Sequence, residues 1–254
     1  MIDEFWYGGA GRSARRWYKN QARSWRRRTF GRWATFSFLT VLLTVLAVIP
    51  HLSPPRWQLL FVFFFGALVA ATMLLPDVLL PDHIARKQRG AWGEQSTAIV
   101  LRRLKRRGWT VRHDLAAPRG NRDHVVVGPS LFLLDSKNWS DSEVTIEGDV
   151  LRVRRIEDPD DGYTTDDPAG KAQRQARALE RELRLALGFG AAVNPVVVVW
   201  GRFTAGEQWI GNVAFVAGDR LAAWLEARPR DLVDPAKQAA VAAWVRGLPR
   251  AELR

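Results

Sequence analysis

The chain contains no cysteine among its 254 residues, so disulfide bonds and thiolate metal sites are excluded. Histidine is nearly as scarce, and the four residues present show neither an HExxH motif nor a paired spacing, which argues against a zinc hydrolase. They are His51, His83, His113 and His124. Internal repeats and low-complexity tracts are also missing from the sequence. Its length therefore predicts one sizeable domain with an accessory segment.

Two stretches near the N-terminus, residues 34–49 and 57–75, lack charged side chains altogether. A helix needs about 20 mostly apolar residues to cross the hydrocarbon core of a bilayer. The second stretch satisfies this, and the first does when it extends to Leu52. The pair predicts a transmembrane helical hairpin within residues 34–80, with spans at about 34–52 and 57–75. Two buried core helices are the alternative. A signal peptide fits less well, because no small-residue cleavage site follows.

The net charge of +12 is concentrated in residues 1–33, which hold nine Lys or Arg against Asp3 and Glu4. The link between the two apolar stretches carries a single basic residue, and basic residues return after the second stretch. Cytoplasmic loops carry the excess of Lys and Arg, so both termini are expected in the cytoplasm, in a multi-pass protein of the inner or plasma membrane. The basic arm is expected to bind anionic lipid, with DNA binding as the alternative.

The remaining residues, 86–254, alternate between helical and strand patterns. Apolar spacing predicts helices over residues 88–107, 169–187, 219–227 and 235–246. Strands are predicted over residues 109–113, 123–127, 131–137, 143–146, 150–154, 195–200 and 213–216. The acidic segment 157–168 is expected to be a solvated connection. This order predicts an α/β fold with a mixed sheet flanked by helices, preceded by the two-helix transmembrane hairpin.

The two strands on either side of the Gly128–Ser130 turn bring acidic residues together. Pairing centred on this turn sets Asp123 opposite Asp135. Directly opposed residues of antiparallel strands share a face of the sheet, and Lys137, two residues beyond Asp135, shares the same face. A register shifted by one residue would turn Asp123 to the other face.

Such a cluster has a chemical purpose. Two close carboxylates raise each other's pKa unless a cation lies between them, and hard oxygen ligands suit Mg²⁺ or Mn²⁺. A bound metal activates water and neutralises charge that develops on phosphorus, while a lysine beside it stabilises the oxyanion. Glu94, on the helix before the sheet, is the natural third acid. Ordinary alternatives exist: Glu94 as a solvated acid of a first helical turn, Asp123 as a turn residue, and Asp135 with Lys137 as a surface ion pair.

Four sequence runs resemble the NERD (nuclease-related domain) family. They are Gly90-Ala-Trp-Gly-Glu94, His113-Asp-Leu115, Asp123-His-Val-Val-Val-Gly-Pro129 and Leu134-Asp-Ser-Lys-Asn-Trp139. Gln175-Ala176 resembles that family's Gln-Ala position, and Lys171 stands where an upstream glutamine is expected. The resemblance covers about Arg86 to Trp200, the core of a domain that extends to residue 254 with C-terminal helices.

The resemblance implies a restriction-endonuclease-like fold of the PD-(D/E)xK superfamily. Carried onto this chain, it makes Glu94, Asp123 and Asp135 ligands of Mg²⁺ or Mn²⁺ and Lys137 the catalytic lysine. It also places Gln175 and Lys171 on the substrate side. Arg122 precedes Asp123 where the superfamily name has proline.

The expected function is a membrane-anchored, divalent-metal-dependent nuclease that hydrolyses phosphodiester bonds of nucleic acid, with DNA as the foremost substrate. Cutting both strands would favour a homodimer. One alternative is a non-catalytic, membrane-tethered module that binds nucleic acid or a protein, and another is a membrane scaffold with a vestigial site. The net charge of +5 that remains for residues 34–254 is modest for a domain that holds a phosphate backbone unaided, which favours these alternatives.

Overall fold

The computed structural model of the chain describes residues 18–25, 27, 30–31, 34–35, 38, 67, 82–118 and 120–251. Residues 18–25, in the basic arm, are helical. The predicted transmembrane hairpin at residues 34–80 lies almost entirely outside the described residues. Within the part of the chain that is described, no helix combines the length and the apolar character that crossing a membrane requires. The chain divides into two compact units, and the unit that contains residues 88–251 holds the sheet.

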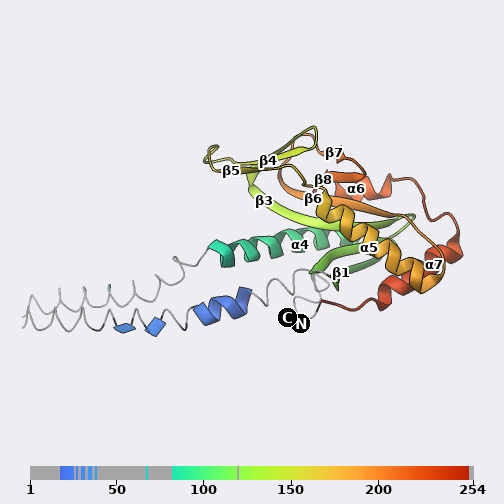
Figure 1. Cartoon of the computed structure of the whole chain (residues 1–254), viewed down its shortest axis with the longest axis horizontal. Coiled ribbons are helices and arrows are strands. Elements are labelled where there is room, and N and C mark those ends of the chain that lie inside the picture. Colours follow the sequence, from blue (N-terminus) through green and yellow to red (C-terminus); the bar gives the residue numbers. More distant parts are fainter. Residues whose placement is uncertain are drawn as a thin grey trace, which may run out of the picture. The chain divides into compact units, whose positions relative to one another are not determined.

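One mixed sheet organises this unit (Figure 1). Its main path runs β1-β2-β3-β6-β8-β7, and β4 and β5 extend it from β3. The pairs β3–β6 and β6–β8 are parallel, and the others are antiparallel. The strands are β1 (Thr110–Ala116), β2 (Asn121–Val127), β3 (Leu131–Glu147), β4 (Val150–Arg155), β5 (Gly162–Thr165), β6 (Val193–Arg202), β7 (Glu207–Ile210) and β8 (Val213–Ala217).

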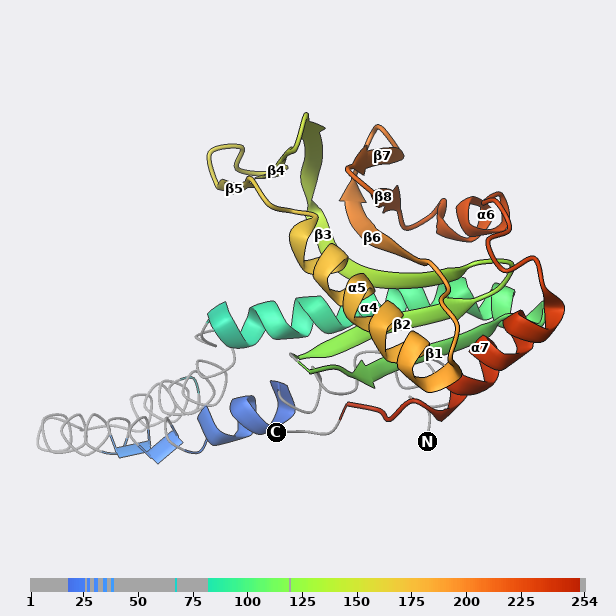
Figure 2. The same ribbon diagram turned by 45° about the vertical axis from the view of Figure 1, so that its right-hand side comes forward.

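Helices cover both faces of the sheet, which confirms the predicted α/β class (Figure 2). They are α4 (Asp82–Arg106), α5 (Gly170–Leu187), α6 (Leu221–Glu226) and α7 (Pro235–Gly247). On one face, Leu101 and Leu104 of α4 pack with α6 against Phe132 and Leu134. On the other face, α5 and α7 pack against the strand residues whose side chains alternate with these, among them Leu131. Burial on both faces explains why the start of β3 is entirely apolar.

Strand β3 is longer than the sequence predicts. Two separate strands, over residues 131–137 and 143–146, were expected because the residues between them are polar. The structure corrects this: β3 is continuous over 17 residues. Parallel pairing with β6 carries it as far as Trp139, opposite Gly201, and it resumes after an irregularity. The second half of β3 then forms an arm with β4 and β5 (Figure 2). Strand β5 lies inside the acidic segment that was expected to be a plain connection, and β7 was not predicted.

The alternation of side chains along β1 inverts at Asp114. Val111 packs in the cluster beneath α4, whereas Leu115 packs in the cluster beneath α5, although strict alternation would put both on one face. Asp114 has φ 53°, a left-handed conformation that aspartate tolerates better than most residues. Its carboxylate accepts a hydrogen bond from Asn121 at 3.0 Å.

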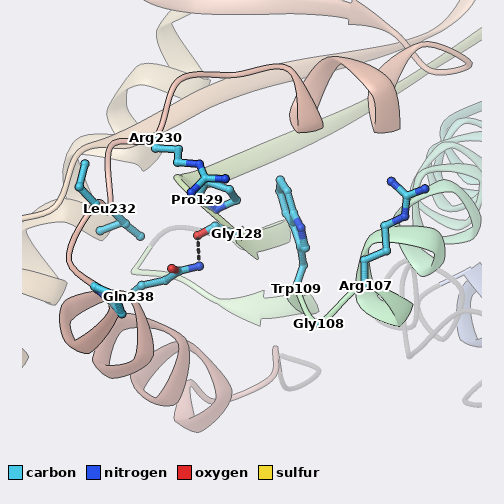
Figure 3. Close-up of a pocket in the computed structure, with 10 residues that line it drawn as sticks. Arg107, Gly108, Trp109, Gly128, Pro129, Arg230, Leu232 and Gln238 are labelled. Atoms are coloured by element: carbon cyan, nitrogen blue, oxygen red, sulfur yellow. Dashed lines mark hydrogen bonds between the residues drawn. The ribbon is translucent and has the colours of Figure 1, made fainter.

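The turn end of the β2–β3 hairpin, at Gly128–Ser130, is the end away from Asp123 and Asp135 and carries no acidic residue. Trp109 lies flat on Gly128, where an added Cβ would come within 2.4 Å of the indole ring. A cavity of about 350 Å³ opens beside this turn, lined among others by Trp109, Pro129 and Arg230 (Figure 3). Gln238 of α7 reaches the turn and donates to the carbonyl of Gly128 at 2.8 Å (Figure 3). No carboxylate lines this cavity, so the acidic residues of interest must be sought at the other end of the hairpin.

Candidate functional site

The β2–β3 hairpin has the predicted register. Its backbone pairs run from His124 opposite Leu134 down to the turn, which is the pairing centred on Pro129. Continued by one residue, this register sets Asp123 beside the Asp135 position. The backbone N–H of Ser136 donates to Oδ2 of Asp123 at 2.8 Å. The hairpin therefore joins the two acids through its own backbone.

Asp135 is buried between two lysines. Asp135 is 4% exposed. Lys137 Nζ lies 2.6 Å from its Oδ2, and Lys171 Nζ lies 2.6 Å from its Oδ1. Burial alone would raise the pKa of Asp135, but the charges and hydrogen bonds of the two ammonium groups outweigh it and hold the pKa below its usual value. Asp135 is therefore a stable carboxylate at neutral pH.

Asp123 responds in the opposite direction. Burial, followed by the negative charge of Asp135, raises the pKa of Asp123 from 3.8 to about 6, and the two lysines and the Ser136 N–H offset only part of this. A carboxylate that is costly to ionise beside a second carboxylate is the usual consequence of like charges in a shared site. A cation placed between them would remove the penalty.

Glu94 reaches the same place from α4. It lies well inside this helix and is 7% exposed, which contradicts the alternative of a solvated acid in a first helical turn. The preceding Gly93 lets α4 lie against β3, because a Cβ there would already be 3.1 Å from Cβ of Asn138. The negative charge of Glu94 helps to raise the pKa of Lys171. The other two alternatives fail as well, since Asp123 lies within β2 and Asp135 is not on the surface.

The negative charges of all three carboxylates act on Lys171. Burial lowers its pKa, but Asp135, Asp123 and Glu94 together raise it above the usual value. Among the described residues, no three Asp, Glu or His side chains stand in the arrangement that would hold a metal ion. In this structure the ammonium groups of Lys171 and Lys137 occupy both oxygens of Asp135. The donor chemistry, all carboxylate oxygen, fits Mg²⁺ or Mn²⁺ in the space that Lys171 now neutralises.

Helix α5 holds the site strands along one side. Besides Lys171, Gln175 donates through Nε2 to the carbonyl of Asn121 at 3.0 Å, at the start of β2. About two helical turns further on, Glu182 forms an ion pair with Arg122 at 2.6 Å. The guanidinium of Arg122 is 1% exposed, so a residue that stands where the superfamily name has proline is here a buried anchor of β2 to α5.

A group of buried polar residues near the site was not expected from the sequence. His113 and His124 lie directly opposite each other on β1 and β2, and their Nδ1 atoms are 2.7 Å apart. His124 also forms a hydrogen bond with Ser136 of β3, and Ser136 forms one with Thr97 of α4. The sequence held one usable sign of this: both histidines fall in predicted neighbouring strands, so antiparallel pairing could set them opposite each other.

Comparison with known families finds one similarity, which covers less than half of the chain. Residues 89–200 match the family described as NERD, the nuclease-related domain. The matched region contains all four predicted site residues as well as Lys171 and Gln175. A mixed sheet flanked by helices is consistent with the PD-(D/E)xK superfamily. No curated protein and no solved structure matches the chain.

Proposed function

We propose that the domain from residue 86 onward is a divalent-metal-dependent nuclease of the PD-(D/E)xK type, with DNA as its foremost substrate. The observation that carries the proposal is the buried Asp135, which forms ion pairs with both Lys137 and Lys171. The negative charges of Asp123 and Glu94 also act on Lys171. The four predicted site residues come from α4, β2 and β3, and all lie in the region that resembles the nuclease-related domain.

The roles follow from the surroundings of each residue. Asp135 is the carboxylate most ready to bind a cation, because its pKa is held low. Asp123 and Glu94 would complete the ligand set. A divalent ion bound there would activate water and neutralise the negative charge of the phosphodiester. Lys137 is 35% exposed at its side chain, so its ammonium group can reach a substrate phosphate and still contact Asp135.

Attachment to a membrane is part of the proposal. Its support is the sequence: two charge-free stretches within residues 34–80 and the basic arm of residues 1–33. The apolar hairpin would anchor the domain in the inner or plasma membrane, the arm would bind anionic lipid, and both termini would face the cytoplasm. A reporter fused after Arg254 tests the topology: cytoplasmic activity is expected, and a periplasmic signal would contradict the hairpin.

A second candidate function is favoured by one observation. Both oxygens of Asp135 are already occupied by lysine, so the carboxylates are neutralised without a metal. In that case the same fold would serve as a membrane-tethered module, monomeric or homodimeric, that binds nucleic acid through its basic groups. Such a module would shift DNA in a gel with a steep dependence on salt, and Asp135→Asn would leave the shift unchanged.

The deciding experiment is cleavage of linear, circular and single-stranded DNA by the full chain purified in mild detergent, with Mg²⁺, with Mn²⁺ and with EDTA. Lys137→Ala and Asp135→Asn should each lower the rate by at least about 100-fold, the usual loss when a group that stabilises developing charge is removed. Lys237→Ala is the matched lysine control, because Lys237 lies on α7, outside the motif segments, and its ammonium lies over the ring of Phe189.

Metal-dependent cleavage that Lys137→Ala abolishes and Lys237→Ala preserves would establish the nuclease. Equal cleavage by all variants would identify a contaminating enzyme and leave this chain without the activity. An absence of cleavage with every metal and substrate, together with a salt-sensitive gel shift, would transfer the assignment to the binding module.

A further inference from the structure

A chain of hydrogen bonds between side chains runs beneath the candidate site, on the α4 side of the sheet. It starts at His113, whose Nδ1 lies 2.7 Å from Nδ1 of His124. His124 Nε2 lies 3.1 Å from the hydroxyl of Ser136, which lies 2.8 Å from the hydroxyl of Thr97. Thr97 in turn donates to the carbonyl of Gly93 at 3.0 Å. All four side chains are buried, and His124 and Thr97 are fully buried.

The direction of every bond follows from the donor that each group has. Thr97 has one hydroxyl hydrogen and gives it to Gly93, so Ser136 must donate to Thr97. Ser136 has then used its own hydrogen and accepts from Nε2–H of His124. A neutral His124 that is protonated on Nε2 has a lone pair on Nδ1, so Nδ1–H of His113 is the donor of the first bond. Burial lowers the pKa of both histidines, which keeps them neutral.

Three of the five groups in this chain stand next to a candidate site residue in the sequence. Gly93 precedes Glu94, His124 follows Asp123, and Ser136 stands between Asp135 and Lys137. The chain therefore connects the three segments that carry the candidate site, although none of its side chains belongs to the site itself. Neighbouring residues on a strand point to opposite faces, so polar groups beneath the sheet can fix the strand whose acids point above it.

Thr97 is the junction of the chain. Besides the bonds to Ser136 and Gly93, its oxygen accepts from the indole Nε1 of Trp200 on β6 at 2.8 Å. Its hydroxyl thus uses one donor and two acceptor positions, which is its full capacity. A buried network in which the members are satisfied specifies a single arrangement of the elements that it joins.

We propose that Ser136 and Thr97 are positioning residues, and that the directed chain from His113 to Gly93 sets the spacing of Glu94, Asp123 and Asp135 and hence their affinity for a divalent cation. This inference rests on the proposed function. In metal sites, residues that do not touch the ion but hold its ligands in place contribute about 10- to 100-fold to metal affinity. The buried hydroxyl network would have this role here.

The test measures Mn²⁺ binding to the full chain by calorimetry and by the change in the water proton relaxation rate. Thermal unfolding in EDTA is the parallel measurement. Ser136→Ala and the isosteric Thr97→Val should raise the Mn²⁺ Kd by about 10- to 100-fold. Thr97→Ser keeps the hydroxyl and should restore the Kd to within about threefold of the natural chain. Where cleavage is measurable, the loss should appear in kcat, with KM for DNA nearly unchanged.

Ser130→Ala is the matched control for general destabilisation. Ser130 lies one residue before β3, at the end of the hairpin away from the acids, and is 1% exposed. Its hydroxyl donates to the carbonyl of Pro229 at 2.6 Å and accepts from the N–H of Asp231. This variant should lower the unfolding temperature about as much as Ser136→Ala and leave Mn²⁺ binding unchanged.

The outcomes separate the inference from the proposed function. Weakened binding in Ser136→Ala and Thr97→Val, with Thr97→Ser and Ser130→Ala near the natural value, supports the inference. Natural affinity in all variants overturns the inference and leaves the nuclease assignment standing. An equal loss in Ser130→Ala also overturns it, because the effect would then be a loss of stability. A natural chain that neither binds Mn²⁺ nor cleaves DNA overturns the proposed function, and the inference with it.

Discussion

Lys171 Nζ lies 2.6 Å from Oδ1 of Asp135, on the side of that carboxylate that Lys137 does not occupy. Position 171 holds this lysine where the family resemblance leads us to expect glutamine. An ammonium group there competes for the carboxylate with any metal ion, so the structure makes Lys171 a built-in counter-charge of the site.

We expect Lys171→Gln to tighten Mn²⁺ binding. Removing a positive charge beside the ligands removes its repulsion of the ion, and because the lysine side chain is 52% exposed the gain is limited to about tenfold, or roughly 1.4 kcal/mol. Calorimetric titration at two salt concentrations measures it, and the gain should shrink at high salt. Lys171→Arg keeps the charge and is the control. Unchanged or weaker binding in Lys171→Gln would show that Lys171 does not compete with the metal.

Asp123→Asn should stabilise the metal-free protein at high pH. The pKa of Asp123 is raised to about 6 in the folded chain, against 3.8 otherwise, so the folded state binds a proton that the unfolded state releases. The contribution to stability is therefore fully present below pH 3.8 and is lost as pH rises from 3.8 through about 6, by up to about 3 kcal/mol. Asparagine carries no charge and still accepts from the Ser136 N–H.

The measurement is chemical unfolding in EDTA at pH 5 and at pH 8. The stability advantage of Asp123→Asn should be complete at pH 8 and roughly half as large at pH 5. Equal effects at both values would mean that Asp123 has an ordinary pKa in the folded chain, and the like-charge interaction with Asp135 would have to be abandoned.

His113 gives the opposite dependence on pH. Burial, followed by the positive charges of Lys105, Arg250 and Arg112, lowers the pKa of His113 from 6.5 to about 4. The unfolded chain then binds a proton that the folded chain does not, so stability is complete above pH 6.5 and is lost as pH falls toward 4, by up to about 3 kcal/mol. His113→Gln should remove this part of the slope between pH 6.5 and 4. An unchanged slope in urea unfolding would contradict the buried neutral histidine.

The pair of Arg122 and Glu182 gives an asymmetric prediction. Arg122 is 1% exposed at its side chain and Glu182 is 34% exposed, so removing the acid leaves a buried charge unpaired, whereas removing the base leaves an acid that water reaches. We expect Glu182→Ala to cost about 2–4 kcal/mol of unfolding free energy and Arg122→Met, which keeps most of the volume, to cost less.

A surface pair provides the control for that comparison. Arg174 and Asp167 are 71% and 67% exposed, and Asp167→Ala should change the unfolding free energy by less than about 0.5 kcal/mol. If Arg122→Met proved costlier than Glu182→Ala, the hydrogen bond from Arg122 to the carbonyl of Ala116 would be the more important contact.

The sequence predicted the hairpin and its acids because their determinants are local. A turn at Gly128–Ser130 fixes the centre of pairing, and side-chain alternation then decides which residues share a face. Leu131 to Leu134 marked a strand buried on both sides, and the structure confirms this. The helix that carries Glu94 precedes the sheet, as predicted, and packs on β3 at Gly93, while the role of Glu94 in the site stays a prediction.

What the sequence could not show depended on contacts between distant segments. The bond between Lys171 and Asp135 arises only because α5 crosses the sheet over β3. The length of β3 depends on parallel pairing with β6, which outweighs the polar residues in its middle. The inversion at Asp114 was hidden too, because no sequence period marks a single left-handed residue.

The continuity of β3 limits how this domain can change in length. One continuous strand carries the buried hairpin, the Asp135–Lys137 pair and the projecting arm, with an irregularity in its pairing only after Trp139. Because side chains alternate from residue to residue, inserting a single residue near Lys137 would turn the whole arm over relative to the core. Added length can be accommodated without this inversion at the far end of the arm, in the turn between β3 and β4, where Glu147 pairs with Val150. Homologous chains should therefore vary in the tip of the arm and keep its root constant.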